Sequence, residues 1–251
     1  DLVSEEISLF IIGDSKGFKS PIETFLISVA IYPEPFIISN SWSLSSSVRP
    51  SGCLFSRFCN NEVIFTMSVS FQKDEEGISH SIDMPKVPQP EELKDELQLR
   101  EENIDKIPEE LRPFLLSERE YSIKWVEWND ILNPKKLPPI RNIWLKPNGK
   151  IPSDRSKQYA FLAYVSDSGL LAPCLYPHGM SYMSPNLMMA SLDHAMWFHK
   201  TDFIWDDWIL YATDSPYTGN ARGLGRGTFF SRNGDVIASV TQEGLFRIKN
   251  S

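Results

Sequence analysis

The sequence contains few cysteines, no long apolar run and no excess of positive charge. Its three cysteines form an odd and sparse set that predicts no disulfide framework: Cys53, Cys59 and Cys174. No apolar stretch approaches the roughly 20 residues that a membrane helix requires. Lys and Arg total 25 against 33 Asp and Glu. The formal net charge of −8 therefore argues against a general nucleic-acid-binding protein, which would carry a basic excess.

Targeting signals are also absent from the two ends of the sequence. The chain begins at Asp1 without the basic and apolar stretches of a secretory signal. Its last three residues, Lys249-Asn250-Ser251, differ from a peroxisomal address of the Ser-Lys-Leu type. The sparse cysteines predict an intracellular protein. Peroxisomal and cytoplasmic locations both stay open, because no address of the Ser-Lys-Leu type decides between them.

The acidity of the chain is local. The 251 residues are 41% hydrophobic, enough for one domain or two small ones with a sizeable core. Residues 73–112 hold 13 acids and 6 bases (6 − 13 = −7), whereas residues 141–251 hold 9 acids and 11 bases (11 − 9 = +2). We interpret residues 73–119 as an acidic connector with a solvated charged face and a helix over Glu91–Asp105. The C-terminal half is expected to accept an anionic ligand.

The N-terminal part gives one clear element. Alternating apolar and polar residues predict a half-buried strand over Glu62–Gln72. Before it, Ile7–Ile12 and Phe25–Ile31 have the composition of strands, whereas Ser39–Ser56 is serine-rich and irregular.

The C-terminal part predicts one helix followed by long strands. Residues Gln158–Val165 are apolar almost all round, which is typical of a buried helix, and Ser153 is a candidate N-cap. An Asn233-Gly234 turn joins the last two strands. Strands are predicted at Tyr121–Trp128, Arg141–Leu145, Leu187–His199, Trp208–Thr213, Ala221–Ser231 and Val236–Lys249. This order indicates an α+β domain.

Short motifs of other enzyme classes carry little weight. Gly13-Asp14-Ser15-Lys16-Gly17 matches a G-x-S-x-G nucleophile elbow, but Pro21 stands where the required helix should continue, which favours an ordinary turn. The glycines of Gly223–Gly227 lack a following helix, and strand glycines that pack closely against a helix are expected instead. His194 and His199 are five apart, which is wrong for a helical zinc pair, so no metal site or cofactor is predicted.

Three polar residues stand in unusual places. Asp167 follows the apolar helix, where the helix dipole disfavours a carboxylate. Gln242 is the polar member of an apolar strand face that also contains Val236, Ala238, Val240, Gly244, Phe246 and Ile248. Ser191 is predicted on the face opposite Leu192, Met196 and Phe198. Taken alone, each residue favours a structural role, but together they provide a carboxylate, a hydroxyl and an amide that could hold one water molecule.

Several segments resemble the acyl-CoA thioesterase II family, the double hot-dog thioesterases. The similarity runs from about Glu62 to Arg247, in the same order and with close spacing. The segments are Ile64-Phe, Ser70-Phe-Gln72, Tyr159–Asp167, Pro177-His-Gly179, Ser191–His199, Trp208–Tyr211, Ala221–Leu224 and Ala238–Arg247.

The resemblance implies two hot-dog units, each a helix wrapped by a curved antiparallel sheet. These would be residues 1–72 and 120–251, joined by the connector 73–119. It implies hydrolysis of fatty acyl-CoA to a free acid and CoA, with no cofactor. The family's catalytic aspartate, Ser or Thr, and glutamine correspond to Asp167, Ser191 and Gln242, which would bind and orient one water, with Asp167 as the proton acceptor.

The first 61 residues depart from the family pattern, because its glycine-rich helix start and its Arg-Asp-Gly turn are not recognisable. We therefore expect the first hot dog to be incomplete or diverged. Its exposed apolar sheet would require a partner chain, which predicts a homo-oligomer. Two alternatives stay open: a catalytically impaired relative that binds acyl-CoA or assembles with other subunits, and an α/β-hydrolase that uses Ser15.

Overall fold

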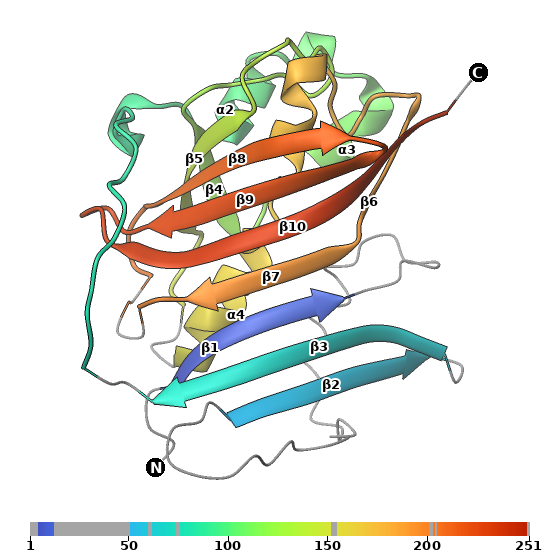
Figure 1. Cartoon of the computed structure of the whole chain (residues 1–251). Coiled ribbons are helices and arrows are strands. Elements are labelled where there is room, and N and C mark those ends of the chain that lie inside the picture. The colour runs from blue at the N-terminus through green and yellow to red at the C-terminus, as the bar shows by residue number, and fades with distance from the viewer. Residues whose placement is uncertain are drawn as a thin grey trace.

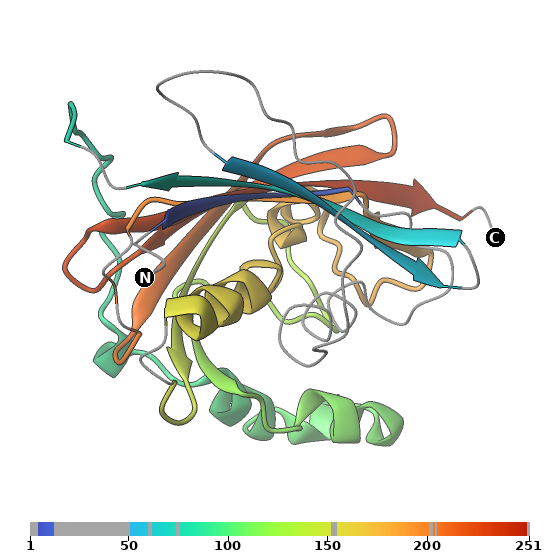
Figure 2. The same cartoon turned by 90° about the horizontal axis from the view of Figure 1, so that it is seen from below.

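The described part of the chain forms one curled antiparallel sheet around a helix (Figures 1 and 2). The computed structural model describes residues 5–12, 51–59, 62–73, 76–151, 155–200, 203 and 205–249. Its strands are β1 (Glu5–Ile12), β2 (Ser51–Cys59), β3 (Glu62–Lys73), β4 (Tyr121–Trp125), β5 (Ile140–Pro147), β6 (Leu187–Ser191), β7 (Asp193–Phe198), β8 (Ile209–Gly219), β9 (Arg222–Phe230) and β10 (Val236–Ile248). The order across the sheet is β2-β3-β1-β7-β10-β9-β8-β5-β4, and β6 pairs with β10.

Most of the predicted strands are confirmed. The alternating segment before the connector is β3, where Met67 and Val69 are buried and Ser68 is exposed. Ile7–Ile12 lies within β1. The prediction that Ser39–Ser56 is irregular is wrong for its last residues, because β2 begins at Ser51 and pairs with β3. The predictions for Phe25–Ile31, Ser15 and the N-cap Ser153 lie outside the described residues.

The prediction of one strand over Leu187–His199 is wrong. The chain breaks at Leu192, whose N–H donates to the Glu243 carbonyl (2.9 Å), while the Asp193 carboxylate accepts from the Glu243 N–H (2.7 Å). β6 and β7 therefore pair with successive parts of β10. Leu192 is the extra residue, and it shifts the alternation of side chains between β6 and β7. Ser191 and Met196 therefore lie on the same face of the sheet, because both pair with residues of the inward face of β10.

The buried helix α4 (Arg155–Ser166) lies against the concave face of the sheet (Figure 2). Leu162 and Val165 are fully buried, in the same core as Met196, Phe229 and Val240 of the strands. The sequence-based prediction of a buried helix is therefore confirmed. Within the described residues no helix is long and apolar enough to span a membrane.

The connector contains less helix than its sequence pattern predicts. In place of one helix over Glu91–Asp105, the chain forms a 3-10 turn at Pro90–Glu92, the short helix α2 (Glu96–Glu101) and a second 3-10 turn at Ile104–Lys106. The short α3 (Arg112–Leu115) follows. Few apolar positions fall in this stretch, so little packing energy supports a longer helix.

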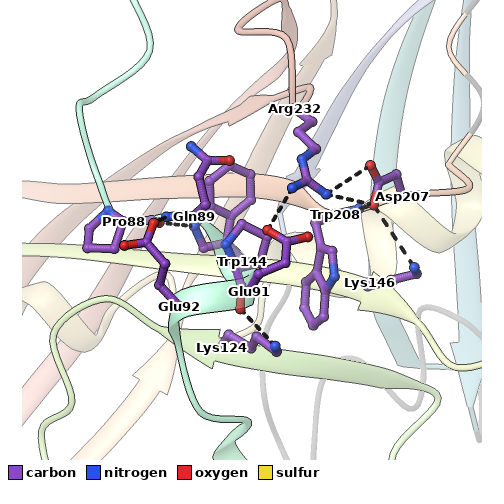
Figure 3. Close-up of polar contacts among 11 residues, drawn as sticks. Pro88, Gln89, Glu91, Glu92, Lys124, Trp144, Lys146, Asp207, Trp208 and Arg232 are labelled. Atoms are coloured by element: carbon purple, nitrogen blue, oxygen red, sulfur yellow. Dashed lines mark hydrogen bonds and ion pairs between the residues drawn. The ribbon is translucent and has the colours of Figure 1, made fainter.

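The start of the connector is fastened to the outer side of the sheet (Figure 3). The Trp144 indole N–H donates to the Pro88 carbonyl (2.9 Å), and Lys124 donates to the Pro90 carbonyl (2.8 Å). Arg232 pairs with both Glu91 and Asp207. Met84, Val87 and Leu93 cover a small outer core formed by Trp144, Leu210 and Phe230. The connector is thus part of the folded body.

The prediction of a solvated charged face is wrong at two connector residues. The side chains of Glu96 and Arg100 are buried, and Arg100 donates to Glu96 (2.9 Å) and to the Leu115 carbonyl (2.7 Å). Arg119 adds a second contact to Glu96 (3.1 Å). Tertiary packing against β4 and the segment after α3 buries these charges, which a linear charge count cannot show.

Candidate active site

Asp167 lies on a turn whose two flanking residues are firmly held. Helix α4 ends at Ser166, whose carbonyl accepts a hydrogen bond from the Tyr211 hydroxyl. On the other side, the Ser168 carbonyl accepts from Arg141 (2.9 Å), and the Ser168 hydroxyl accepts from Tyr121 (3.0 Å). These bonds come from three different strands, so the backbone of Asp167 is positioned by the tertiary structure.

Glycines in the sheet allow this turn to lie close to β9 and β10. A Cβ at Gly225 would lie 2.5 Å from the Leu170 carbonyl oxygen, and a Cβ at Gly244 would lie 2.5 Å from Leu171. Real side chains would push the turn away from the sheet. The close approach expected at the Gly223–Gly227 glycines is present, but the expected partner, a helix, is wrong. Gly225 lies against Leu170, which follows α4, whereas Gly227 lies against Tyr211 and Val240 of neighbouring strands.

The close approach brings Asp167 to Gln242. Gly225 is the residue of β9 that pairs with Gln242 on β10. The Gln242 amide nitrogen donates to Asp167 Oδ1 over 2.6 Å, and Gln242 itself is 3% exposed. The inward face of β10 is confirmed at Ala238, Val240, Gly244 and Phe246. The prediction is wrong at both ends of the strand: a register shift places Val236 in the outer core, and Ile248 is exposed.

Ser191 faces the same space from β6. It pairs with Gly244, two positions from Gln242, so both side chains lie on the concave face. Asp167, Ser191 and Gln242 line one cavity of about 370 Å³. The structure therefore brings the three sequence-predicted residues together.

Burial sets the proton affinity of Asp167. Removal from water raises the pKa of Asp167 to about 7, and the hydrogen bond from Gln242 opposes part of that rise. No Lys or Arg of the described chain lies within ion-pair distance of this carboxylate. A carboxyl group with a pKa near neutrality can accept a proton from a reacting group and release it again.

His194 lies behind Asp167 and was missed by the sequence reasoning. The Ser166 hydroxyl donates to the Ala163 carbonyl (2.7 Å), so it accepts from His194 Nε2 (2.7 Å), which assigns the imidazole proton to Nε2. Nδ1 then carries a lone pair, without a hydrogen-bond partner in the described residues, 3.9 Å from Asp167 Oδ1. Burial lowers the pKa of His194 to about 4, so the ring is neutral and offers Asp167 no positive charge.

The signal that could have identified His194 is the one that identified Gln242. His194 shares an apolar strand face with Met196 and Phe198, and all three are buried. Within the described residues no group of three or more potential metal ligands occurs. His199 instead contacts the Ser239 hydroxyl (2.9 Å).

Arg141 is the second residue that sequence reasoning missed. It lies on β5, is 2% exposed, and lines the cavity that also contains Asp167. Its position in a strand-like segment gave no sign of burial, because charged residues in strands usually face water.

The cavity thus combines a base of near-neutral pKa with neutral and cationic hydrogen-bond donors. Its other lining residues include apolar side chains such as Leu171, Leu175 and Met189, together with the connector residues Arg100 and Arg119. Such a site can orient a water molecule against a carbonyl carbon and accommodate an aliphatic group.

Comparisons with known proteins point in one direction. The family model for acyl-CoA thioesterases matches residues 115–245. Acyl-CoA thioesterase 2 of Haemophilus influenzae is 34% identical over 198 residues, which are 77% of this chain and 69% of that protein. Acyl-coenzyme A thioesterase 8 of Homo sapiens is 34% identical over 194 residues, 74% of this chain but 60% of its own length. The chain thus spans less than two thirds of this human relative.

Solved structures agree on the fold. The acyl-CoA thioesterase II TesB2 from Mycobacterium marinum superimposes with a TM-score of 0.70 at 28% identity, covering 98% of this chain and 81% of that one. A hot-dog-fold protein of unknown function from Alicyclobacillus acidocaldarius gives a TM-score of 0.68 at 14% identity, covering 99% and 81%. The curled antiparallel sheet is therefore a hot-dog fold.

Proposed function

The chain belongs to the acyl-CoA thioesterase family, and from this premise we propose that it hydrolyses acyl-CoA thioesters to a free acid and CoA. The observation that carries the proposal is the pairing of Asp167 with Gln242 beside Ser191. Here a half-buried carboxyl group of near-neutral pKa, without a cationic partner in the described chain, borders a cavity.

In the proposed mechanism, Asp167 accepts a proton from a water molecule that attacks the thioester carbonyl. The Gln242 amide donates through Nε2 to Asp167 Oδ1, which fixes the carboxylate and leaves Oε1 as the acceptor of the amide. The Ser191 hydroxyl and this oxygen would orient the water. No acyl-enzyme intermediate is required, since the nucleophile is water and no side chain has to be acylated.

Release of free CoA thiol from a series of acyl-CoA chain lengths tests this proposal. We expect turnover by the unchanged chain and a strong loss of turnover in Asp167→Asn and Gln242→Ala. Ser15→Ala should keep the turnover of the unchanged chain. Full activity of Asp167→Asn would exclude the proposed base. Tight acyl-CoA binding without turnover would instead identify the impaired relative, and loss only in Ser15→Ala would identify a serine hydrolase.

We propose the same family architecture for the whole chain: a first hot-dog unit over residues 1–72, the connector over 73–119, and a second unit over 120–251. Three described strands, β1–β3, continue the sheet beyond β7, which supports the division. Helix α4 belongs to the second unit. In this proposal the first unit is incomplete or diverged from the family.

A homo-oligomer is the assembly we propose, in which a second copy covers apolar sheet of the first unit. Light scattering of the purified chain distinguishes this from a monomer. The compartment, peroxisomal or cytoplasmic, stays a prediction that localisation of the full-length protein would test.

A further inference from the structure

Arg141 is a buried guanidinium held between two surfaces. One face lies over the Trp125 ring, with Cζ 4.6 Å from the ring centroid. The other lies against Gly169, where an added Cβ would be 3.1 Å from Cζ. Gly169 has a φ of +69°, in the left-handed region that favours glycine, so backbone and side-chain requirements coincide at this position.

The positive charge of Arg141 is only partly satisfied. Its NH1 donates to the carbonyls of Ser168 (2.9 Å) and Gly169 (3.4 Å), whereas Nε has no hydrogen-bond partner within the described chain. No carboxylate of the described ranges lies within ion-pair distance, including Asp167. Burying an unpaired cation is costly, and proteins rarely keep one without an anion nearby.

The two other arginines of the cavity behave differently. Arg100 and Arg119 both contact the Glu96 carboxylate, at 2.9 and 3.1 Å. Their charge is therefore at least partly neutralised inside the protein. Arg141 lines the same cavity without such a partner, and it is hydrogen-bonded to the two carbonyls that follow Asp167. A base and a cation thus border one space without pairing with each other.

We propose that Arg141 is the anion-binding residue of this cavity and takes the oxygen of the reacting group. This assignment rests on the proposed thioester hydrolysis. The ligand class is an oxygen anion on carbon, namely the carbonyl oxygen as it gains charge and then the carboxylate of the released acid. Guanidinium groups suit this role because their planar donors match carboxylate geometry.

Water forms a bond to the carbonyl carbon and gives one proton to Asp167, while the carbonyl π electrons move to the oxygen bound by Arg141. The oxygen then restores the double bond, and the C–S bond breaks. The departing sulfur takes the proton from Asp167, and the acid loses its remaining proton to solvent, so that Arg141 holds a carboxylate.

Direct binding of octanoate and octan-1-ol to the full chain tests this without requiring turnover. We expect octanoate to bind at least about tenfold more tightly than the alcohol, since a charge-assisted hydrogen bond has about that worth. Arg141→Met should remove the preference while leaving alcohol binding unchanged, and Arg141→Lys should keep part of it. Arg119→Met, which removes a paired arginine of the same cavity, is the matched control and should keep it.

Each result of these binding experiments either supports or overturns the role of Arg141. Equal binding of acid and alcohol by the unchanged chain overturns the proposal, as does a preference that survives in Arg141→Met or disappears in Arg119→Met. Arg141→Gln, which retains a donor for Ser168, replaces the Met variant if that variant does not fold. If no acyl-CoA is hydrolysed but the acid preference depends on Arg141, the hydrolase proposal fails and the anion site stands. With turnover, Arg141→Met should lower kcat about 100-fold with little change in KM.

Discussion

Two carboxylates, Asp167 and Glu96, line the same cavity and are held in opposite ways. Glu96 lies between Arg100 and Arg119 and is paired with both. Asp167 faces an amide donor and the lone pair of a neutral imidazole, with no cation of the described chain in contact. The first arrangement holds a charge in place. The second leaves the pKa of Asp167 to burial, which raises it to about 7.

One cavity can therefore contain both a structural and a reactive carboxylate. The two guanidinium groups around Glu96 hold its carboxylate in place as part of the packing of α2. A carboxylate that is desolvated, but only lightly hydrogen-bonded, keeps its tendency to take up a proton near neutral pH. Substitution of Asp167 should therefore remove activity without a loss of stability, whereas substitution of Glu96 should lower stability.

The largest expected effect is on turnover in Asp167→Asn. Asparagine can still accept the hydrogen bond from Gln242 but cannot take up a proton, so kcat should fall by about 10²–10⁴-fold, the range for a general base. CoA release under saturating substrate measures this. Asp214→Asn, an exposed carboxylate paired with Arg226, is the control and should retain activity.

Glu96→Gln should produce the largest loss of stability. It leaves the buried Arg100 and the half-buried Arg119 around a neutral amide, and breaking a buried pair costs about 3–5 kcal/mol of unfolding free energy. Urea denaturation measures this loss. Glu101→Gln changes an exposed residue of the same helix and should stay within about 0.5 kcal/mol of the unchanged chain. Equal effects of the two substitutions would contradict the structural role of Glu96.

Asp167→Asn should stabilise the fold at high pH. The folded pKa of Asp167, about 7, lies above its ordinary value of 3.8, so folding favours the protonated form. The stability this group contributes is present below about pH 4 and is lost as the pH rises to 7. The variant does not undergo this loss. Its unfolding free energy, relative to that of the unchanged chain, should therefore rise by up to about 4 kcal/mol between pH 4 and pH 8. A pH-independent difference would show that Asp167 does not titrate as described.

The smallest effect is a displacement of the pH profile. Activity of the unchanged chain should rise through about pH 7 as Asp167 loses its proton. Gln242→Leu removes the hydrogen bond that opposes the rise in pKa, so the residual activity should titrate about one pH unit higher. Thr241→Val, on the opposite face of β10, is the control. A midpoint that moves downward in Gln242→Leu would be inconsistent with the observed hydrogen bond.

Sequence patterns anticipated much of this structure, with identifiable exceptions. The buried helix and most strands follow from their apolar periodicity, because burial of a face is what stabilises each element. The interruption of the strand at Leu192 has no signal in the local sequence, because it depends on hydrogen bonds to Glu243 on another strand. In the connector, the sequence pattern predicted exposure where the structure shows burial. The charges of Glu96 and Arg100 are typical of a solvent-exposed face, whereas packing against β4 buries both side chains.

The sequence by itself determined the chemical types at the site and their order along the chain: a carboxylate after a buried helix, a hydroxyl at a strand end and an amide in an apolar face. Only the tertiary structure decided that these groups meet, since Gly225 and Gly244 let the Asp167 turn approach the sheet. The tertiary structure alone also decided which charges lack partners. Proton affinity and ion binding depend on distance and burial, and the linear order of residues contains neither.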